Sequence, residues 1–166
     1  SVFSVAVVAQ SIEPEIHGVR NDLPRPYVTQ RNWGELPVGT EAWAAVTAVE
    51  PSPDGQFIYV IHRCFENSCE DRPEPPILKY DYDGNLQSAF GAGLFIFPHG
   101  ASVDHEGNLW VADARGNEEI GHQVFKFSPE GEILMTLGQR GRGGSGPNLL
   151  HSPNDVVIDP NDGDIF

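Results

Sequence analysis

Short apolar segments separated by turn dipeptides run through most of the chain after residue 45. One kind of hairpin, with an Asp-Gly or Glu-Gly turn between two apolar segments, occurs at residues 48–60, 102–111 and 157–166. A second kind alternates with it, at residues 77–86 and 124–134. Glycine in such turns adopts a positive φ at little cost, as two-residue hairpin loops require. Because no window shows the period of an amphipathic helix, the pattern predicts a nearly all-β chain.

The first kind of hairpin recurs at a nearly constant spacing. Asp54 and Glu106 lie about 52 residues apart, and Glu106 and Asp162 about 56, within the range of propeller blades and solenoids. With the second hairpin in between, each period holds four short strands, which favours a β-propeller over a sandwich. The sequence stops within a strand of the third period. We therefore expect about two and a half blades and a fragment of a longer protein, because propellers close with about four to eight blades.

The first residues differ from the repeats. Residues 1–9 are apolar and uncharged and end in small residues, as before a signal-peptidase site. We interpret residues 1–10 as the tail of a secretory signal, residues 11–39 as an irregular segment and residues 40–166 as the partial propeller. A buried first strand is the alternative for the N-terminal segment, which is too short to span a membrane. We therefore expect a secreted protein, extracellular or periplasmic.

Cysteine content and charge agree with export. Cys64 and Cys69 bracket a four-residue loop, and a disulfide across it would fix the exit of a strand. Two free thiols are the alternative. The formal net charge is −14 and no stripe of Lys and Arg is present, which argues against a nucleic-acid partner. A strong net charge also favours solubility.

The tripeptide Pro98-His99-Gly100 places an imidazole just before the innermost strand of its blade, where the inner loops of a propeller converge on the central channel. Alignment of the three repeats puts Ala45 and Asn154 at equivalent positions, so the scaffold does not require a histidine. A zinc site would need further protein ligands and an open position, supplied by other blades. A structural role for His99 is the alternative. His151, near the same end of the next repeat, is a further candidate.

His62 and Arg63 also differ from their repeat. The same alignment pairs them with Ala112 and Asp113, so that an arginine replaces a carboxylate of the kind that caps a turn. A guanidinium is always charged and binds carboxylates or oxyanions through paired hydrogen bonds. The alternative for Arg63 is an ordinary ion pair with the acidic loop at residues 66–71.

These motifs resemble NHL repeats and, more closely, the lyase domain of peptidylglycine α-amidating enzymes, the peptidyl-α-hydroxyglycine α-amidating lyase. The segment Phe97-Pro98-His99-Gly100 resembles the zinc-histidine blade of that lyase, residues 122–127 its following strand, and residues 146–160 the next blade. The pair His62-Arg63 falls where the lyase has a His-Arg pair. The resemblance extends from about residue 40 to residue 166 and implies an NHL-type β-propeller, with six blades when complete.

The resemblance implies a role for each matching residue. His99 matches one of three zinc-binding histidines, and Arg63 matches an active-site arginine beside the zinc. The backbone carbonyls of Ala101 and, in a looser alignment, Thr47 fall where the family holds a structural calcium ion. The other zinc ligands and a tyrosine proposed as the base would follow beyond this sequence.

The implied reaction cleaves a peptidyl-α-hydroxyglycine into a peptide amide and glyoxylate, as a carbon–nitrogen lyase. It needs no redox cofactor, because hydroxylation belongs to a separate copper monooxygenase, the implied partner. The chain departs from the family by an insertion at residues 115–119 and by His151, at a position where a cysteine is common. Two other functions stay open: a non-catalytic secreted NHL propeller that acts as a binding scaffold, and another propeller enzyme such as a gluconolactonase-like hydrolase.

Overall fold

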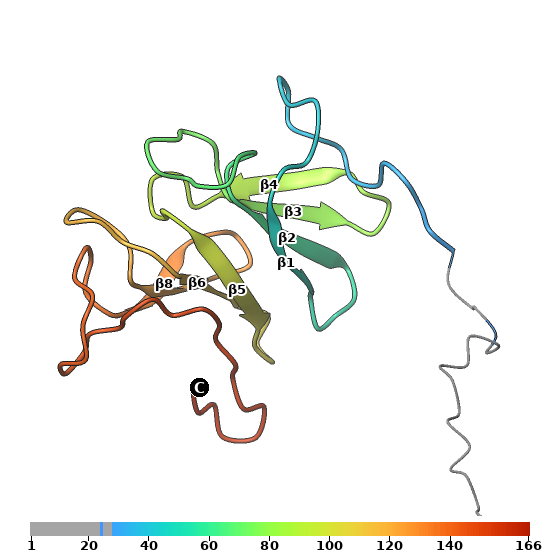
Figure 1. The fold of residues 1–166 in the computed structure, drawn as a ribbon. Helices are drawn as coiled ribbons and strands as arrows, with labels where there is room; N and C mark the ends of the chain where they lie inside the picture. Colours follow the sequence, from blue (N-terminus) through green and yellow to red (C-terminus); the bar gives the residue numbers. More distant parts are fainter. Residues whose placement is uncertain (1–23, 25–27) are drawn as a thin grey trace, which may run out of the picture. The chain divides into compact units, whose positions relative to one another are not determined.

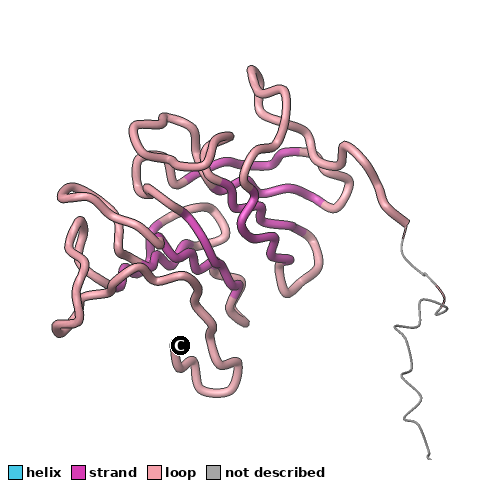
Figure 2. Tube along the Cα trace, in the orientation of Figure 1, coloured by secondary structure: helices cyan, strands magenta, loops and turns pink. Residues whose placement is uncertain are grey.

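The computed structural model describes residue 24 and residues 28–166. The expected signal tail, residues 1–10, lies outside the described residues, as does most of the segment 11–39 that we expect to be irregular. Residues 32–166 form one compact unit. Its strands make two four-stranded antiparallel sheets, and the described residues contain no helix (Figure 1; Figure 2).

Each sheet follows the order of the chain. The first sheet consists of β1 (Val46–Pro51), β2 (Phe57–His62), β3 (Ile77–Asp81) and β4 (Leu86–Phe90). The second consists of β5 (Pro98–Val103), β6 (Leu109–Asp113), β7 (Val124–Phe127) and β8 (Ile133–Leu137). A four-stranded antiparallel meander is the unit of a β-propeller. The all-β prediction with four strands per repeat is confirmed, and a bridge between Ile158 and Ile165 begins the third repeat.

The turn between β5 and β6 is closed by the carboxylate of Asp104. This side chain accepts hydrogen bonds from the main-chain N–H groups of Glu106 (3.0 Å) and Asn108 (2.9 Å) and from Trp110 Nε1 (3.0 Å). Burial opposes ionisation of Asp104, but these bonds and the ammonium of Lys126 lower its pKa to about 2. The turn thus fixes the register of β5, the strand that begins at the candidate metal ligand.

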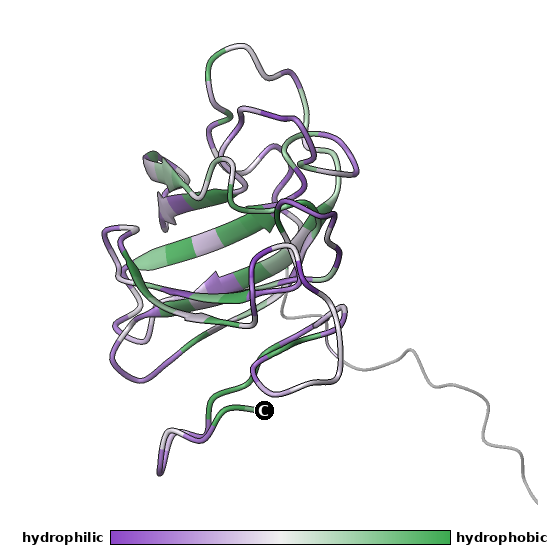
Figure 3. Cartoon of the chain, turned by 90° about the vertical axis from the view of Figure 1, so that its left-hand side faces the viewer, coloured by the Kyte–Doolittle hydropathy of each residue, from purple (hydrophilic) through white to green (hydrophobic). Residues whose placement is uncertain are grey.

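The main hydrophobic core lies between the two sheets, and both contribute to it. It contains Tyr59, Ile61, Ile77, Phe95, Ala101, Leu109, Val111, Phe125 and Phe127. The strands are largely hydrophobic and the connecting loops largely polar (Figure 3). Because the inner strands β1 and β5 each pack into this core, contact between the blades holds them side by side.

Main-chain hydrogen bonds show which positions of the two blades are equivalent. The N–H of Arg63 donates to the carbonyl of Ala45 at 2.9 Å, and the N–H of Ala114 donates to the carbonyl of Phe97 at 3.0 Å. Arg63 is therefore equivalent to Ala114, and Ala45 to Phe97.

Two residues further along the inner strand, Thr47 is equivalent to His99. The alignment of Ala45 with His99 is therefore wrong by two residues, whereas the turn hydrogen bonds of the third repeat keep Asn154 at the equivalent position. A shift of two residues preserves the alternation of side chains between the two faces of a strand, so the hydrophobic pattern does not reveal it.

The comparison of strand ends also changes. His62, and not Arg63, takes the position of Asp113, so the prediction that Arg63 replaces a capping carboxylate is wrong. The inner turn is closed between residues 52 and 57 in the first blade and between residues 104 and 108 in the second, so the offset between the blades falls from 52 residues before the turn to 51 after it. The main-chain pairing of the strands sets this offset, and the predicted pairing of Arg63 with Asp113 is out by one residue.

Candidate active site

The candidate site lies where β5 begins, at an irregularity of the strand. β5 pairs with β6 at Pro98↔Asp113 and again at Ala101↔Val111, and the register shifts between these pairs. β1 has the same irregularity between Val46 and Ala48. Bulges of this kind re-aim side chains and are frequent next to functional sites. The two inner strands therefore present His99 and its equivalent, Thr47, from matching bulges.

His99 is half-buried and anchored through one ring nitrogen. Its Nδ1 lies 2.9 Å from the carbonyl oxygen of Asn154, which also accepts the N–H of Gly100 at 2.8 Å. A carbonyl only accepts hydrogen bonds, so Nδ1 donates to it and Nε2 is the ring nitrogen left to bind a metal. Metal-binding histidines are typically oriented in this way. A Cβ at position 100 would clash with the side chain of Asp155, so this close approach requires glycine.

Two arginines stack on the aromatic ring that precedes this histidine. The guanidinium carbon of Arg63 lies 3.4 Å from the centroid of the Phe97 ring, and that of Arg115 lies 3.8 Å from it. Two groups this close to one centroid cannot share a face without overlapping, so they lie on opposite faces. The Phe97 and His99 ring centroids are 6.4 Å apart. Arg63, Arg115 and His99 therefore surround one buried phenylalanine.

Neutral groups orient the guanidinium of Arg63. Its Nη1 donates to Asn67 Oδ1 at 2.8 Å and its Nε donates to the carbonyl of Pro98 at 3.4 Å. Burial, followed by repulsion from Arg115, lowers the pKa of Arg63 from its usual value. Among the residues that the structure describes, no carboxylate pairs with Arg63 or Arg115. The ion pair considered for Arg63 with the acidic loop is absent there, since Glu66 lies instead 4.0 Å from Arg72.

A buried carboxylate binds the main chain at Phe97. Asp113 is fully buried and accepts hydrogen bonds from the main-chain N–H groups of Ile96 at 2.9 Å and Phe97 at 2.6 Å. Burial raises the pKa of Asp113 to about 6, although these bonds and one from the Arg115 main chain act in the opposite direction. Asp113 therefore ties the segment that carries Phe97 to the loop that carries Arg115.

His62 occupies the equivalent position in the first blade and is also fully buried. Its Nδ1 accepts the main-chain N–H of Phe65 at 3.1 Å, and its Nε2 lies 3.1 Å from the carbonyl of Pro75. Burial lowers the pKa of His62 to about 4, so the ring is neutral at pH 7. Because both nitrogens bond to the main chain, this candidate has a structural position and no ring nitrogen open to a metal.

Cys64 and Cys69 are joined by a disulfide, with their Cα atoms 5.1 Å apart. The loop that they close also holds the segment before Phe97. The N–H of Cys69 donates to the carbonyl of Ile96 at 2.8 Å, and Ser68 Oγ donates to the same oxygen at 3.2 Å. The disulfide loop thus braces the main chain that positions Phe97.

The remaining candidate residues contact groups other than His99. His151 stacks on His122, with ring centroids 5.7 Å apart. Thr47 Oγ1 donates to the carbonyl of Ile61 at 3.4 Å, and Ala101 is buried in the core. Thr47 and Ala101 are not equivalent positions of the two repeats, and the calcium site stays a prediction. Within residue 24 and residues 28–166, no three His, Cys, Asp or Glu side chains form a metal-binding group.

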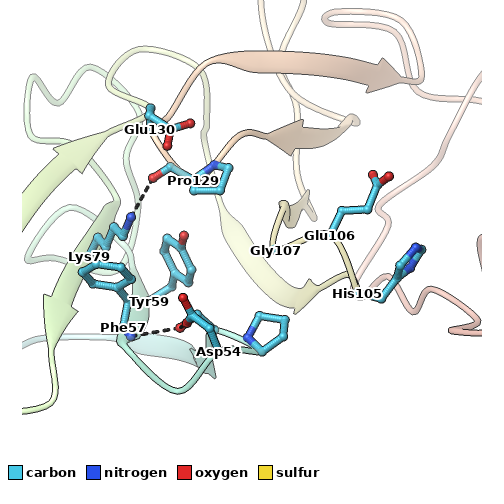
Figure 4. A pocket seen from close by; sticks show the side chains of 11 residues that line it. Asp54, Phe57, Tyr59, Lys79, His105, Glu106, Gly107, Pro129 and Glu130 are labelled. Carbon is cyan, nitrogen blue, oxygen red and sulfur yellow. Dashed lines mark hydrogen bonds between the residues drawn. The ribbon is translucent and has the colours of Figure 1, made fainter.

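A separate cavity of about 460 Å³ lies between the blades at the turn ends of the inner strands (Figure 4). Two of its charged side chains, Lys79 and Asp54, bond to the protein itself. Lys79 Nζ donates to the carbonyl of Pro129 at 2.9 Å and lies 4.0 Å from the Phe57 ring centroid, and Asp54 accepts the Ser52 hydroxyl at 2.6 Å. We therefore place the candidate site at His99 and not in this cavity.

Sequence reasoning found His99 and Arg63 but missed Phe97, Arg115 and Asp113. Phe97 was noted only as part of a motif, and Arg115 only as the start of an insertion. The single available signal was that two arginines each follow an inner hairpin; only the folded chain shows that both contact one ring.

No protein-family model matches the chain. It is 31% identical over 153 residues to peptidyl-α-hydroxyglycine α-amidating lyase 2 of Drosophila melanogaster, covering 82% of this chain and 35% of the fly protein. It is 43% identical over 84 residues to the peptidylglycine α-amidating monooxygenase of Rattus norvegicus, covering 49% of this chain and 8% of that protein. The chain is homologous to peptidyl-α-hydroxyglycine α-amidating lyases. The resemblance inferred from the motifs is thereby confirmed.

A human relative supports the repeat type. NHL repeat-containing protein 3 of Homo sapiens is 33% identical over 96 residues, covering 55% of this chain and 27% of the relative. The fold is thus an NHL-type β-propeller. Among solved structures, a luciferin-regenerating enzyme matches with a TM-score of 0.44 and 22% identity, covering 72% of this chain and 35% of that chain. This chain spans about a third of the length of the fly lyase, with which it is homologous.

Proposed function

We propose that the chain is part of a zinc-dependent lyase that cleaves an α-hydroxyglycine-type substrate into an amide and glyoxylate. The observation that carries this proposal is the grouping of His99, with one nitrogen anchored and the other available, and Arg63 around the ring of Phe97. Homology to named lyases supports this reaction, and the grouping is consistent with a physical role for each residue.

The chemistry of His99 suits a zinc ligand. Its Nδ1–H bond to Asn154 fixes the ring and leaves Nε2 for a metal, the arrangement expected of a zinc-binding histidine. This chain would supply one ligand, and residues outside the described part would supply the others. Zinc bound there would polarise the hydroxyl of the substrate and stabilise negative charge on its oxygen.

Arg63 would bind the terminal carboxylate of the substrate. Its fork of N–H donors matches a carboxylate, and its stacking on Phe97 removes water from one face, which strengthens the ionic interaction. The reaction then loses the hydroxyl proton, breaks the bond between the α-carbon and the amide nitrogen, and returns a proton to that nitrogen. The hydroxyl oxygen becomes the aldehyde oxygen of glyoxylate, and no electron acceptor is needed.

The proposal also covers the source of the substrate, the location of the protein and a structural metal ion. The hydroxylated substrate must come from an oxygenase, a reaction class that the rat relative's name includes. The described part of the chain holds no helix with the length and apolar character of a membrane span. We propose a secreted protein with a peptide substrate and a structural calcium ion at the carbonyls of Ala101 and Thr47.

The test uses the whole protein that contains this chain. We expect about one zinc per propeller by elemental analysis and release of glyoxylate from an α-hydroxyglycine peptide, both lost in His99→Ala. Arg63→Gln should retain zinc but lose turnover. A protein that binds peptides without metal and without releasing glyoxylate would be the binding scaffold instead.

A further inference from the structure

We propose that Arg115 is a second anion-recognition residue of this site, and that the preferred substrate carries an acidic side chain on the residue preceding its terminal hydroxyglycine. This inference rests on the proposed function. It adds to it a substrate class and a residue from the insertion at residues 115–119.

The guanidinium of Arg115 is charged and has no acceptor among the described residues. No hydrogen bond or ion pair joins its side chain to any of them, and its contact with Phe97 is to the face of the ring. The chain has 24 Asp and Glu against 10 Lys and Arg. In so acidic a protein, two neighbouring arginines without a carboxylate partner leave a local positive site available for an anion.

Two groups of the loops near Arg115 bond to other parts of the chain. Glu70 accepts a hydrogen bond from Asn117 Nδ2 at 3.0 Å, and the main-chain carbonyl of Glu119 accepts one from Arg140 Nε at 3.0 Å. The loop that carries Arg115 is thereby tied to the disulfide loop on one side and to a later segment on the other. Arg115 is left facing Phe97.

The main chain at Arg115 is held on both sides. Its carbonyl accepts the N–H of His122 at 3.0 Å, and Gly116 bridges to Gly121 across the loop. Gly121 approaches the Arg115 carbonyl so closely that a Cβ there would overlap it. The main-chain N–H of Arg115 also acts to lower the pKa of the buried Asp113. These contacts fix the main chain at Arg115, as expected for a residue that selects a substrate.

The two faces of Phe97 offer separate positions for two anionic groups. Groups packed on the two faces of a ring stand about 7 Å apart, and Phe97 fills the space between them. Phe97 separates the two guanidiniums, so a carboxylate bound on the Arg63 face of the ring leaves the Arg115 face open to a second anion. If Arg63 holds the terminal carboxylate, Arg115 faces a second group. An acidic side chain on the adjacent residue is the nearest that a peptide can offer.

The experiment compares two α-hydroxyglycine peptides that differ only in Glu or Gln at the preceding residue. In the whole protein, kcat/KM should favour the Glu peptide by roughly tenfold, as expected for one hydrogen bond between charged groups. Arg115→Gln should bring the ratio close to one, and Arg115→Lys should restore part of it. Arg142→Gln is the matched control, because it removes an exposed arginine that bonds only to Gln139 among the described residues, and it should leave the ratio unchanged.

Unreactive peptides ending in Glu-Gly and Gln-Gly separate this inference from the proposed function. Calorimetry should show tighter binding of the Glu-Gly peptide in an Arg115-dependent manner, weakened by added salt. If this preference appears but no peptide releases glyoxylate, the lyase proposal fails and the anion site stands. If glyoxylate is released from both peptides at equal kcat/KM, or if Arg115→Gln slows both by the same factor, the inference about Arg115 is overturned.

Discussion

The same position of the repeat carries His62 in the first blade and Asp113 in the second, and both side chains are fully buried. His62 accepts the N–H of Phe65, whereas Asp113 accepts those of Ile96 and Phe97. Two different side chains thus do one structural task, which is to satisfy the loop N–H groups at a strand end. The difference between them is therefore no evidence of catalysis.

The neighbouring positions differ in another way. Thr47 stands where the second blade has His99, and Ala114 stands where the first blade has Arg63. Among the described residues, none of these four side chains accepts a loop N–H group as His62 and Asp113 do. The comparison of the blades therefore indicates that candidate functional residues are those that differ between the blades at positions with no such structural task.

The largest effect should come from the structural position. Asp113→Ala leaves two buried N–H groups without their acceptor, at a cost of about 1–3 kcal/mol each, so the free energy of unfolding should fall by about 4 kcal/mol. Urea unfolding at pH 7 measures this. Thr47→Ala, at a half-buried position, is the control and should cost less than about 1 kcal/mol. Equal losses in the two variants would refute the structural role of Asp113.

The pH dependence separates the two buried groups. The pKa of Asp113 is raised to about 6 in the folded protein, from about 3.9 in an unfolded chain. Its stabilising contribution is complete below pH 4 and is lost as the pH rises through 6, by up to roughly 3 kcal/mol. The pKa of His62 is lowered to about 4, so its contribution is present above pH 6.5 and is lost as the pH falls through 4.

Unfolding measured from pH 3 to pH 8 in the wild type, Asp113→Asn and His62→Gln tests these directions. Asp113→Asn should remove the loss of stability between pH 4 and 6. His62→Gln should remove the loss on acidification. An Asp113→Asn profile that parallels the wild type would show that Asp113 does not titrate in this range.

The positions left free by the fold should affect activity instead of stability. We expect His99→Ala to reduce glyoxylate release by at least about a hundredfold and to abolish zinc binding. Its free energy of unfolding without metal should change by less than about 1 kcal/mol. Thr47→Ala, at the equivalent position, should retain activity; a similar loss of activity in both variants would remove the distinction between the blades.

The smallest expected effect concerns the two loops that meet at Phe97. The first blade holds its loop with the Cys64–Cys69 disulfide, whereas residues 115–121 have no such link. Cys64→Ser combined with Cys69→Ser should cost about 2 kcal/mol, because the closed loop is short. Hydrogen exchange at Ile96 and Phe97 should rise with it. Unchanged exchange there would show that the disulfide does not brace Phe97.

The strands could be predicted from the sequence because their causes are local. Alternation, Asp-Gly and Glu-Gly turns and a repeat near 50 residues specify hairpins and their order without any knowledge of packing. The candidate zinc ligand followed from the same source, since Pro98-His99-Gly100 interrupts a repeat. The equivalence of residues across blades did not follow, because a slip of two residues leaves the alternation intact and the inner turns of the two blades differ in length by one residue.

The sequence by itself determined an all-β chain of four-stranded repeats, and it singled out His99 and Arg63. Only the tertiary structure decided that His62 is a buried structural group, that Arg63 and Arg115 both contact Phe97, and that Asp113 ties the Phe97 segment to the Arg115 loop. These contacts join residues from separate hairpins, and their formation depends on how the blades pack. Hydrophobic periodicity indicates which face of a strand each side chain lies on, so it carries no information about which loops contact one another.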